Sequence, residues 1–189
     1  MIGRLRGVLV ASRQSGIVID VGGVGYEVAM TTRDLVILPG IGEEIVVHTH
    51  TYVREDEISI YGFASESDRE LFRVLISASG VGPKVGLALL ASMTGEEIVR
   101  AITGEDPDAL TIAPGVGKRG AQKLVLELAP KLAGRETEVV GGHSLGGVRQ
   151  ALEGLGYSTA EINAVVKDLD PNDPIEAQVK AALQRLAKG

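Results

Sequence analysis

The sequence of 189 residues has no cysteine and no tryptophan, and only two phenylalanines and four tyrosines. Without cysteine, the chain has neither a disulfide framework nor a thiolate metal site, which fits a reducing cytosol. No apolar run approaches the roughly 18 residues of a membrane span. Arg4, Arg6 and Arg13 interrupt the amino-terminal apolar stretch, unlike a signal peptide. We therefore expect a cytoplasmic protein with an aliphatic core and no membrane partner.

A surplus of basic residues is also missing. The net charge is −6, whereas simple DNA-binding proteins carry a positive excess. Residues 64–133 come nearest to neutrality, with 8 basic and 9 acidic side chains. Composition alone thus argues against a nucleic-acid partner, and only the local placement of charge can reverse that conclusion.

One short phrase occurs twice, as Gly80-Val81-Gly82-Pro83-Lys84 and Gly115-Val116-Gly117-Lys118-Arg119, with the first glycines 35 positions apart. Each copy follows an apolar run and precedes a helix-like one, which predicts an internal duplication. Glycine permits positive φ and a close approach to a partner, and the next helix offers unpaired N–H groups to an anion. With Lys84 and Lys118 nearby, the two copies predict binding to two backbone phosphates of a nucleic acid.

These glycines have three other interpretations. Gly115, Gly117 and Gly120 satisfy the dinucleotide pattern G-x-G-x-x-G, but that pattern needs a surrounding βαβ unit and an acid about 20 residues on. The acids at that distance lie in a glycine-rich stretch without periodicity. The NTPase phosphate loop fails, because Ile112 replaces its first glycine and Arg119 its magnesium-binding hydroxyl residue. Ordinary helix-connecting turns are the third interpretation, which duplication with lysine in both copies disfavours.

Residues 1–63 have the pattern of short strands, with turn signals at Gly22-Gly23 and Pro39-Gly40. Five or six strands in about 60 residues predict a small barrel of OB-fold size. His48 and His50 share one face of a predicted strand, but no third ligand lies nearby. We interpret both as polar side chains of a half-exposed strand, so no metal site is expected.

Residues 64–133 are predicted to be helical. Ser67 with Glu70 makes a capping box at the start of the first helix, and Thr94 with Glu97 makes another further on. The two glycine phrases lie between helices of this segment.

Residues 134–143 are rich in glycine and show no period, which predicts a flexible linker. The segment 144–189 has the pattern of three short helices, a small bundle of the kind used for binding. The fold class is therefore α+β and multidomain. It consists of an OB-fold barrel over 1–63, a helical domain with both hairpins over 64–133, the linker, and the three-helix bundle over 144–189.

Several of these motifs resemble one known family. The segments Ser79–Lys84 and Pro114–Lys118 look like tandem helix-hairpin-helix motifs, which bind DNA backbones without reading sequence. The start Met1–Gly7 and the segment Thr51–Asp56, followed by Tyr61-Gly62-Phe63, are similar to the RuvA family, the Holliday-junction-recognition subunits of the bacterial branch-migration complex.

The resemblance implies a non-catalytic subunit without cofactor that binds four-way DNA junctions and recruits the hexameric RuvB ATPase. Recombination, DNA repair and the SOS response are the implied processes. A homotetramer is implied, alone or paired as an octamer, and a RuvC-type resolvase is a further candidate partner. The implied DNA-binding residues are Gly80, Val81, Gly82, Lys84, Gly115, Val116, Gly117, Lys118, Arg119 and Lys123.

Other roles are also implied only by the resemblance. Glu55 and Asp56 match the acidic pin of the family, whose carboxylates would repel phosphates at the junction centre; a solvated turn is the alternative. Gly120 departs from the hydroxyl residue or alanine usual in the family, and Lys123 could replace the lost contact. The motor-contact positions fall on Leu152, Leu155, Tyr157 and Leu183, for which the core of the bundle is the alternative.

No constellation for catalysis is present, so three hypotheses of function follow. The first is a junction-binding protein that recruits an ATPase. The second is a nucleotide-dependent oxidoreductase built on Gly115, Gly117 and Gly120, which tight NAD or ATP binding would favour. The third is a protein-interaction adaptor, which salt-sensitive DNA binding would exclude, because phosphate contacts release counterions.

Overall fold

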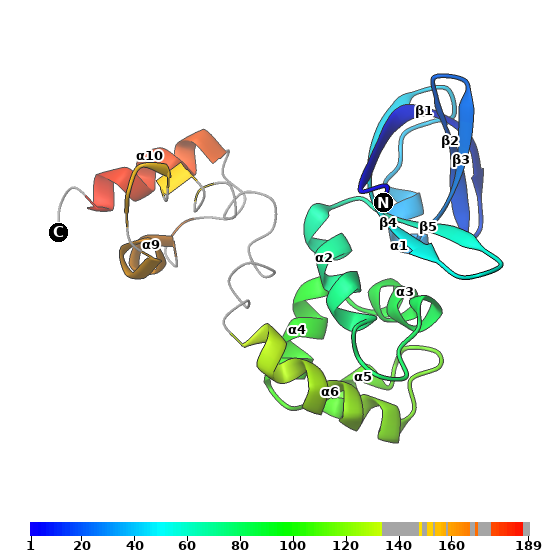
Figure 1. Cartoon of the computed structure of the whole chain (residues 1–189). Helices are drawn as coiled ribbons and strands as arrows, with labels where there is room; N and C mark the ends of the chain where they lie inside the picture. Colours follow the sequence, from blue (N-terminus) through cyan, green and yellow to red (C-terminus); the bar gives the residue numbers. More distant parts are fainter. Residues whose placement is uncertain are drawn as a thin grey trace. The chain divides into compact units, whose positions relative to one another are not determined.

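The computed structural model describes residues 1–133, 148, 151–152, 154–157, 159–166, 169 and 175–186. The chain divides into two compact units, Met1–Gly134 and Arg135–Gly189 (Figure 1). The predicted linker over 134–143 lies outside the described residues.

The first unit begins with a closed five-stranded barrel in the order β1-β2-β3-β5-β4. Neighbouring strands are antiparallel except β3 and β5, which are parallel where Ala29 faces Tyr61. Alternate side chains point inward and form an aliphatic core that includes Leu9, Ile19 and Val47. This confirms the predicted small barrel. The strands are β1 (Arg4–Arg13), β2 (Gly16–Val21), β3 (Val24–Ala29), β4 (Glu44–Val53) and β5 (Ile58–Phe63).

A short helix that the sequence analysis missed, α1 (Thr32–Val36), connects β3 to β4. The Thr31 hydroxyl accepts a hydrogen bond from the Asp34 N–H at 3.1 Å and caps its start. The signal was a threonine three residues before an aspartate, at a point where the alternation of the strand stops.

Five helices complete the first unit: α2 (Glu66–Leu75), α3 (Pro83–Ser92), α4 (Gly95–Thr103), α5 (Pro107–Leu110) and α6 (Lys118–Leu132). The capping box of Thr94 and Glu97 is confirmed. The cap predicted at Ser67 is wrong, because Ser65 is the N-cap of α2 and accepts from the Asp68 N–H at 3.0 Å. Ser65 has the extended backbone of a cap, whereas Ser67 already lies inside the helix.

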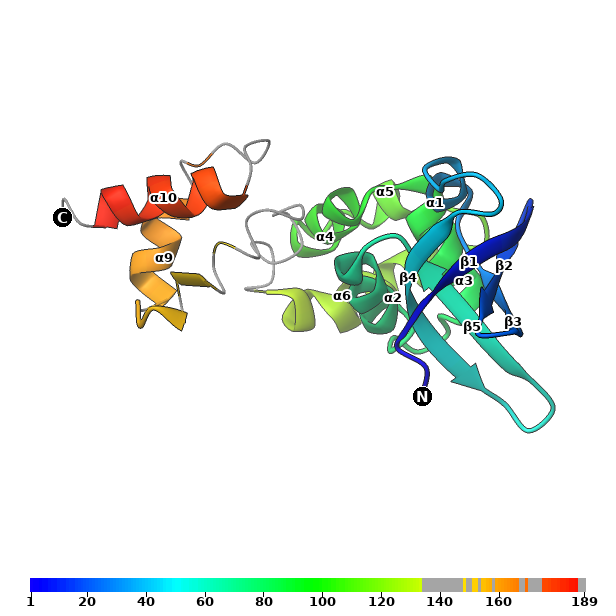
Figure 2. The ribbon, with the colours of Figure 1, turned by 90° about the horizontal axis from the view of Figure 1, so that it is seen from above.

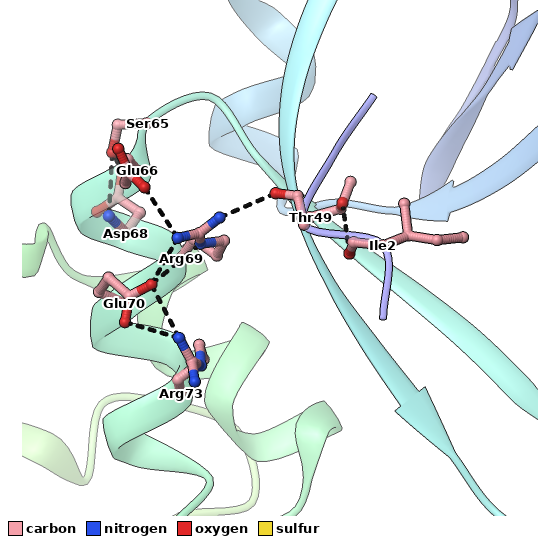
Figure 3. Close-up of polar contacts among 9 residues, drawn as sticks. Ile2, Thr49, Ser65, Glu66, Asp68, Arg69, Glu70 and Arg73 are labelled. Carbon is pink, nitrogen blue, oxygen red and sulfur yellow. Dashed lines mark hydrogen bonds and ion pairs between the residues drawn. The ribbon is translucent and has the colours of Figure 1, made fainter. Parts of the chain in front are cut away.

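Arg69 of α2 joins the barrel to the helices (Figure 3). Its Nη1 donates to the Gly3 carbonyl at 2.9 Å, and its Nη2 donates to Glu66 at 2.9 Å and Glu70 at 2.7 Å. The Arg69 side chain is only 17% exposed, so these partners satisfy a guanidinium that is largely removed from water. On the barrel side, the Thr49 hydroxyl donates to the Ile2 carbonyl at 2.9 Å. The first barrel residues are thus attached to both β4 and α2.

Beside this polar contact lies an aromatic cluster centred on Phe72, a fully buried residue of α2. Its ring centroid is 4.9 Å from that of Phe63, 5.4 Å from Tyr61 and 5.6 Å from His50. Burial lowers the pKa of His50, with smaller contributions from nearby arginines. These rings fix the barrel and the helical domain as one packed body.

The second unit contains α9 (Thr159–Val166) and α10 (Ile175–Leu186), preceded by helical residues around Leu152. The backbone of Gly156 has φ +90°, and the Tyr157 N–H donates to the Leu152 carbonyl at 3.2 Å. This is a Schellman-type end, in which Gly156 terminates the helix that contains Leu152.

No helix in the described ranges is long and apolar enough to cross a membrane. Over the same ranges, His, Cys, Asp and Glu side chains form no group of three or more that could hold a metal ion.

Candidate nucleic-acid interface

The two glycine phrases fold into the same turn. Gly80 has φ +85° and Gly115 has φ +87°, values in the left-handed region that favours glycine. The residue after each glycine donates its N–H to an alanine carbonyl three residues earlier, at 3.1 Å in both copies. The duplication seen in the sequence is therefore a duplication of geometry.

The second glycine of each phrase has a different role from the first. Gly82 and Gly117 are the N-caps of α3 and α6, with extended backbones at φ −87° and −86° that any residue can adopt. A Cβ built on either glycine would meet no atom of the described residues within 4 Å. The backbone conformation does not require glycine at these two positions. The absence of a side chain instead leaves open space in front of each helix N-terminus.

The basic side chains match by position in the helices. Lys84 and Arg119 are each the second residue of their helix, whereas Lys118 corresponds to Pro83. The sequence analysis paired Lys84 with Lys118; the structural equivalent of Lys84 is Arg119. All three cations are exposed, and none forms an ion pair with another described residue. The first turn thus combines a positive dipole end with one free cation, Lys84, and the second combines a positive dipole end with two, Lys118 and Arg119. Both arrangements suit an anion.

Val81 and Val116, predicted among the DNA-binding residues, have internal roles in the turns. Their N–H groups donate to Ala78 and Ala113, and the Val116 side chain is only 8% exposed. We therefore assign both valines to the support of the turns.

Sequence reasoning missed Glu127 of α6, which holds the first turn. Its carboxylate accepts from the Ser79 N–H at 2.8 Å and also from the Ser79 hydroxyl. Further along α6, Lys131 donates to the Ser77 hydroxyl at 2.9 Å. The helix that begins at the second turn therefore fixes the first. Lys123, a predicted DNA contact, lies 3.8 Å from Glu127, and this i,i+4 spacing was the only local signal of an interaction.

Glu127 should make stability depend on pH. Hydrogen bonds from Ser79 hold the pKa of Glu127 below its usual value of 4.5. Because the folded pKa is depressed, the stabilisation is complete above pH 4.5 and is lost as the pH falls through the folded pKa. We expect Glu127→Gln to be less stable than the native chain at pH 7 and to lose less stability on acidification.

Urea unfolding midpoints at neutral and acidic pH would measure this effect. Glu105→Gln is the matched control, because Glu105 is exposed. If Glu127→Gln and Glu105→Gln lose stability equally on acidification, the contact between Glu127 and Ser79 does not stabilise the turn.

The dinucleotide hypothesis does not fit the structure. A βαβ unit requires a strand before the glycine phrase, but the phrase at Gly115 follows a helix, α5, and precedes α6. Gly120 lies inside α6 rather than in a phosphate-binding turn.

The acidic residues Glu55 and Asp56 lie at the tip of the β4–β5 hairpin. The Arg54 N–H donates to the Glu57 carbonyl at 2.8 Å and closes the turn, and Glu55 and Asp56 are both exposed. Figure 2 shows this hairpin extending beyond the other strands of the barrel.

The four predicted motor contacts differ in exposure. Leu152 is fully buried in the core of the second unit, beside Ile162 and Ala182, so its role is to support the fold. Tyr157 and Leu183 are half-buried against the same core, whereas Leu155 is 60% exposed. Leu155 is thus the most accessible of the four to a partner.

Three family models match the chain. Residues 1–62 match the RuvA N terminal domain, residues 72–130 a SAM-like helix-hairpin-helix tandem, and residues 146–187 the RuvA C-terminal domain. The chain is also 42% identical over 192 residues to the Holliday junction branch migration complex subunit RuvA of Rubrobacter xylanophilus, with 98% of each chain covered. The chain belongs to the RuvA family.

Other RuvA relatives agree. The chain is 40% identical over 201 residues to the subunit of Laribacter hongkongensis, covering the whole of both chains. The subunit of Vibrio cholerae is 49% identical over 134 residues, which cover 71% of this chain and 66% of that one. RuvA membership confirms the resemblance and the fold class, an α+β chain with a barrel, tandem hairpins and a RuvA C-terminal domain.

Proposed function

We propose that this chain binds four-way DNA junctions through their phosphate backbones, as the RuvA subunit of a branch-migration complex. The observation that carries the proposal is the pair of equivalent turns, each opening onto a helix N-terminus with free space and free cations. Its relatives are named Holliday junction branch migration complex subunit RuvA.

Contacts of this kind recognise the backbone and not the bases. Main-chain N–H groups and the side chains of Lys84, Lys118 and Arg119 face phosphate oxygens, which are the same in every sequence. Lys123 adds a further cation if it leaves its ion pair with Glu127 and contacts a phosphate instead. The affinity should then be strongly salt-dependent and nearly independent of sequence.

The acidic tip accounts for junction selectivity in this proposal. Glu55 and Asp56 are exposed at the tip of the hairpin, where they repel the phosphates of any duplex that crosses them. An open junction has a gap at its centre and avoids this repulsion. The tip thereby holds the arms apart, and it gives two of the acidic side chains of this negatively charged chain a role in DNA binding.

The second unit serves as the motor-binding module in the proposal. Leu155 offers an exposed apolar contact for the hexameric RuvB ATPase, and Tyr157 and Leu183 offer half-buried ones on the core of the same unit. Catalysis then resides in the motor, and this chain is non-catalytic. We also propose the division into 1–63, 64–133, a linker over 134–143 and 144–189. The proposed assembly is a homotetramer, alone or paired, that can also meet a RuvC-type resolvase in the cytoplasm.

Neutralising the acidic tip tests the proposal. The variant Glu55→Gln with Asp56→Asn should bind linear duplex more tightly by up to roughly tenfold per charge, and the junction by less. The ratio of junction to duplex affinity therefore falls even though both affinities rise. Both affinities would be measured at fixed salt with a four-way junction and a duplex of the same sequence.

The matched control changes the same charge elsewhere on the barrel, with Glu27→Gln and Glu43→Gln. It should strengthen binding to both substrates equally. Equal gains from the tip variant would reduce Glu55 and Asp56 to ordinary surface charges. A native chain without preference for the junction would refute the proposed function itself.

A further inference from the structure

A groove of about 370 Å³ lies between the β4–β5 hairpin and the start of α3. Tyr52, Arg54, Ser59 and Tyr61 line it from the hairpin, and Gly82 and Lys84 line it from the helical domain. The groove therefore connects the base of the acidic tip to the first glycine turn, two features that the proposed function treats separately.

Arg54 lies over the Tyr52 ring and lines this groove. Its guanidinium carbon is 5.3 Å from the centre of the Tyr52 ring, a cation–π contact. The Tyr52 ring packs edge-on against Tyr61 at 6.5 Å, and Tyr61 lies 5.4 Å from the buried Phe72. Arg54 thus contacts the first of a series of aromatic rings that leads to the packed joint of barrel and helices. The contact with Tyr52 reduces the conformational freedom that Arg54 loses when it binds a ligand.

The charges of the groove favour an anion. Arg54 and Lys84 line the groove from different walls, and neither forms an ion pair within the described part of the chain. The one carboxylate that lines the groove, Glu57, accepts a hydrogen bond from the Ser59 hydroxyl at 2.7 Å. Two cations and one hydrogen-bonded carboxylate therefore line the groove, in a chain whose net charge is negative.

We propose that this groove binds the DNA strand that passes from one arm of a junction into the next. Arg54 and Lys84 contact its phosphodiester from two sides, and the rings of Tyr52 and Tyr61 pack against the deoxyribose. The planar guanidinium suits two phosphate oxygens at once. The inference rests on the proposed function and extends it, because the same hairpin then attracts the crossover strand at its base and repels phosphates at its tip.

The test compares two arginines of the barrel. Arg54→Gln should lower junction affinity about tenfold, the effect of one charge-assisted hydrogen bond, and should change duplex affinity by less than about twofold. The log–log salt slope for the junction should also fall by about 0.9. Arg54→Lys keeps the charge and should restore part of the junction affinity.

Arg6→Gln is the control, because Arg6 is exposed, belongs to β1 and is paired with Glu44 at the opposite end of β4 from Arg54. Equal effects of Arg54→Gln and Arg6→Gln, or equal losses of Arg54→Gln on junction and duplex, would overturn the groove as a crossover site. If the native chain prefers junctions and Arg54→Gln retains that preference unchanged, the groove fails while the proposed function stands. If the native chain has no such preference, the proposed function fails first.

Discussion

Replacing Gly82 and Gly117 together with alanine is expected to lower junction affinity about 100-fold with little change in the free energy of unfolding. Each added methyl group would occupy the open space in front of a helix N-terminus, where a phosphate must approach. Losing one charge-assisted contact costs about tenfold, so two turns give about 100-fold. Stability changes little because both backbones are extended, at φ −87° and −86°. Alanine is a poorer N-cap than glycine, which lowers the free energy of unfolding, but it also restricts the unfolded chain, which raises it. Each effect is about 1 kcal/mol or less, so the two largely cancel.

Binding titrations with a four-way junction, together with urea unfolding, would measure both effects. Gly120→Ala is the matched control, because its Cβ also meets no described atom and its position is inside α6. That control should stabilise the helix by about 0.5–1 kcal/mol and leave affinity nearly unchanged. Near-native binding by the double alanine variant would show that phosphates do not approach these two turns.

Phe72→Ala is expected to destabilise the first unit by about 3–5 kcal/mol, the usual cost of removing a buried phenyl ring. The Phe72 ring is fully buried and contacts three other rings, from Phe63, Tyr61 and His50. It also underlies α3, because a Cβ at Gly86 would lie only 3.0 Å from it. A cavity at the Phe72 position therefore removes contacts that join the barrel, α2 and α3.

The midpoint of urea unfolding would measure this loss. Leu126→Ala is the control, since Leu126 is an apolar residue of α6 that is 77% exposed, and its change should stay within about 0.5 kcal/mol. A loss below about 1 kcal/mol for Phe72→Ala would mean that the ring does not hold the barrel and helices together.

Local patterns in the sequence were sufficient for much of the fold. Period-2 alternation predicted the barrel strands, and two residues spaced as Thr94 and Glu97 predicted a capping box that the structure contains. The duplicated glycine phrase predicted two equivalent turns before helices. Each of these features depends on backbone geometry over a few consecutive residues, which composition and spacing report directly.

Local patterns gave a wrong or missing prediction where two residues could cap the same helix, and where a helix was short. Ser67 fitted the capping box as well as Ser65 fits the true cap, because either serine has an acid three residues later. The choice depends on where the chain leaves β5. The helix α1 has only five residues, too few to show a helical period.

Tertiary structure alone decided how the glycine turns, the hairpin tip and the barrel are placed relative to one another. Arg69 donates to the Gly3 carbonyl 66 residues away, and Ser79 donates to Glu127 at a separation of 48. Arg54 and Lys84 line one groove although they belong to different domains of the sequence. No periodicity reports such pairs, because burial of apolar surface decides which elements pack, and the polar side chains at their edges then find partners. The sequence by itself thus determined the turns that we propose to bind phosphate, and only packing determined the spacing at which they are held.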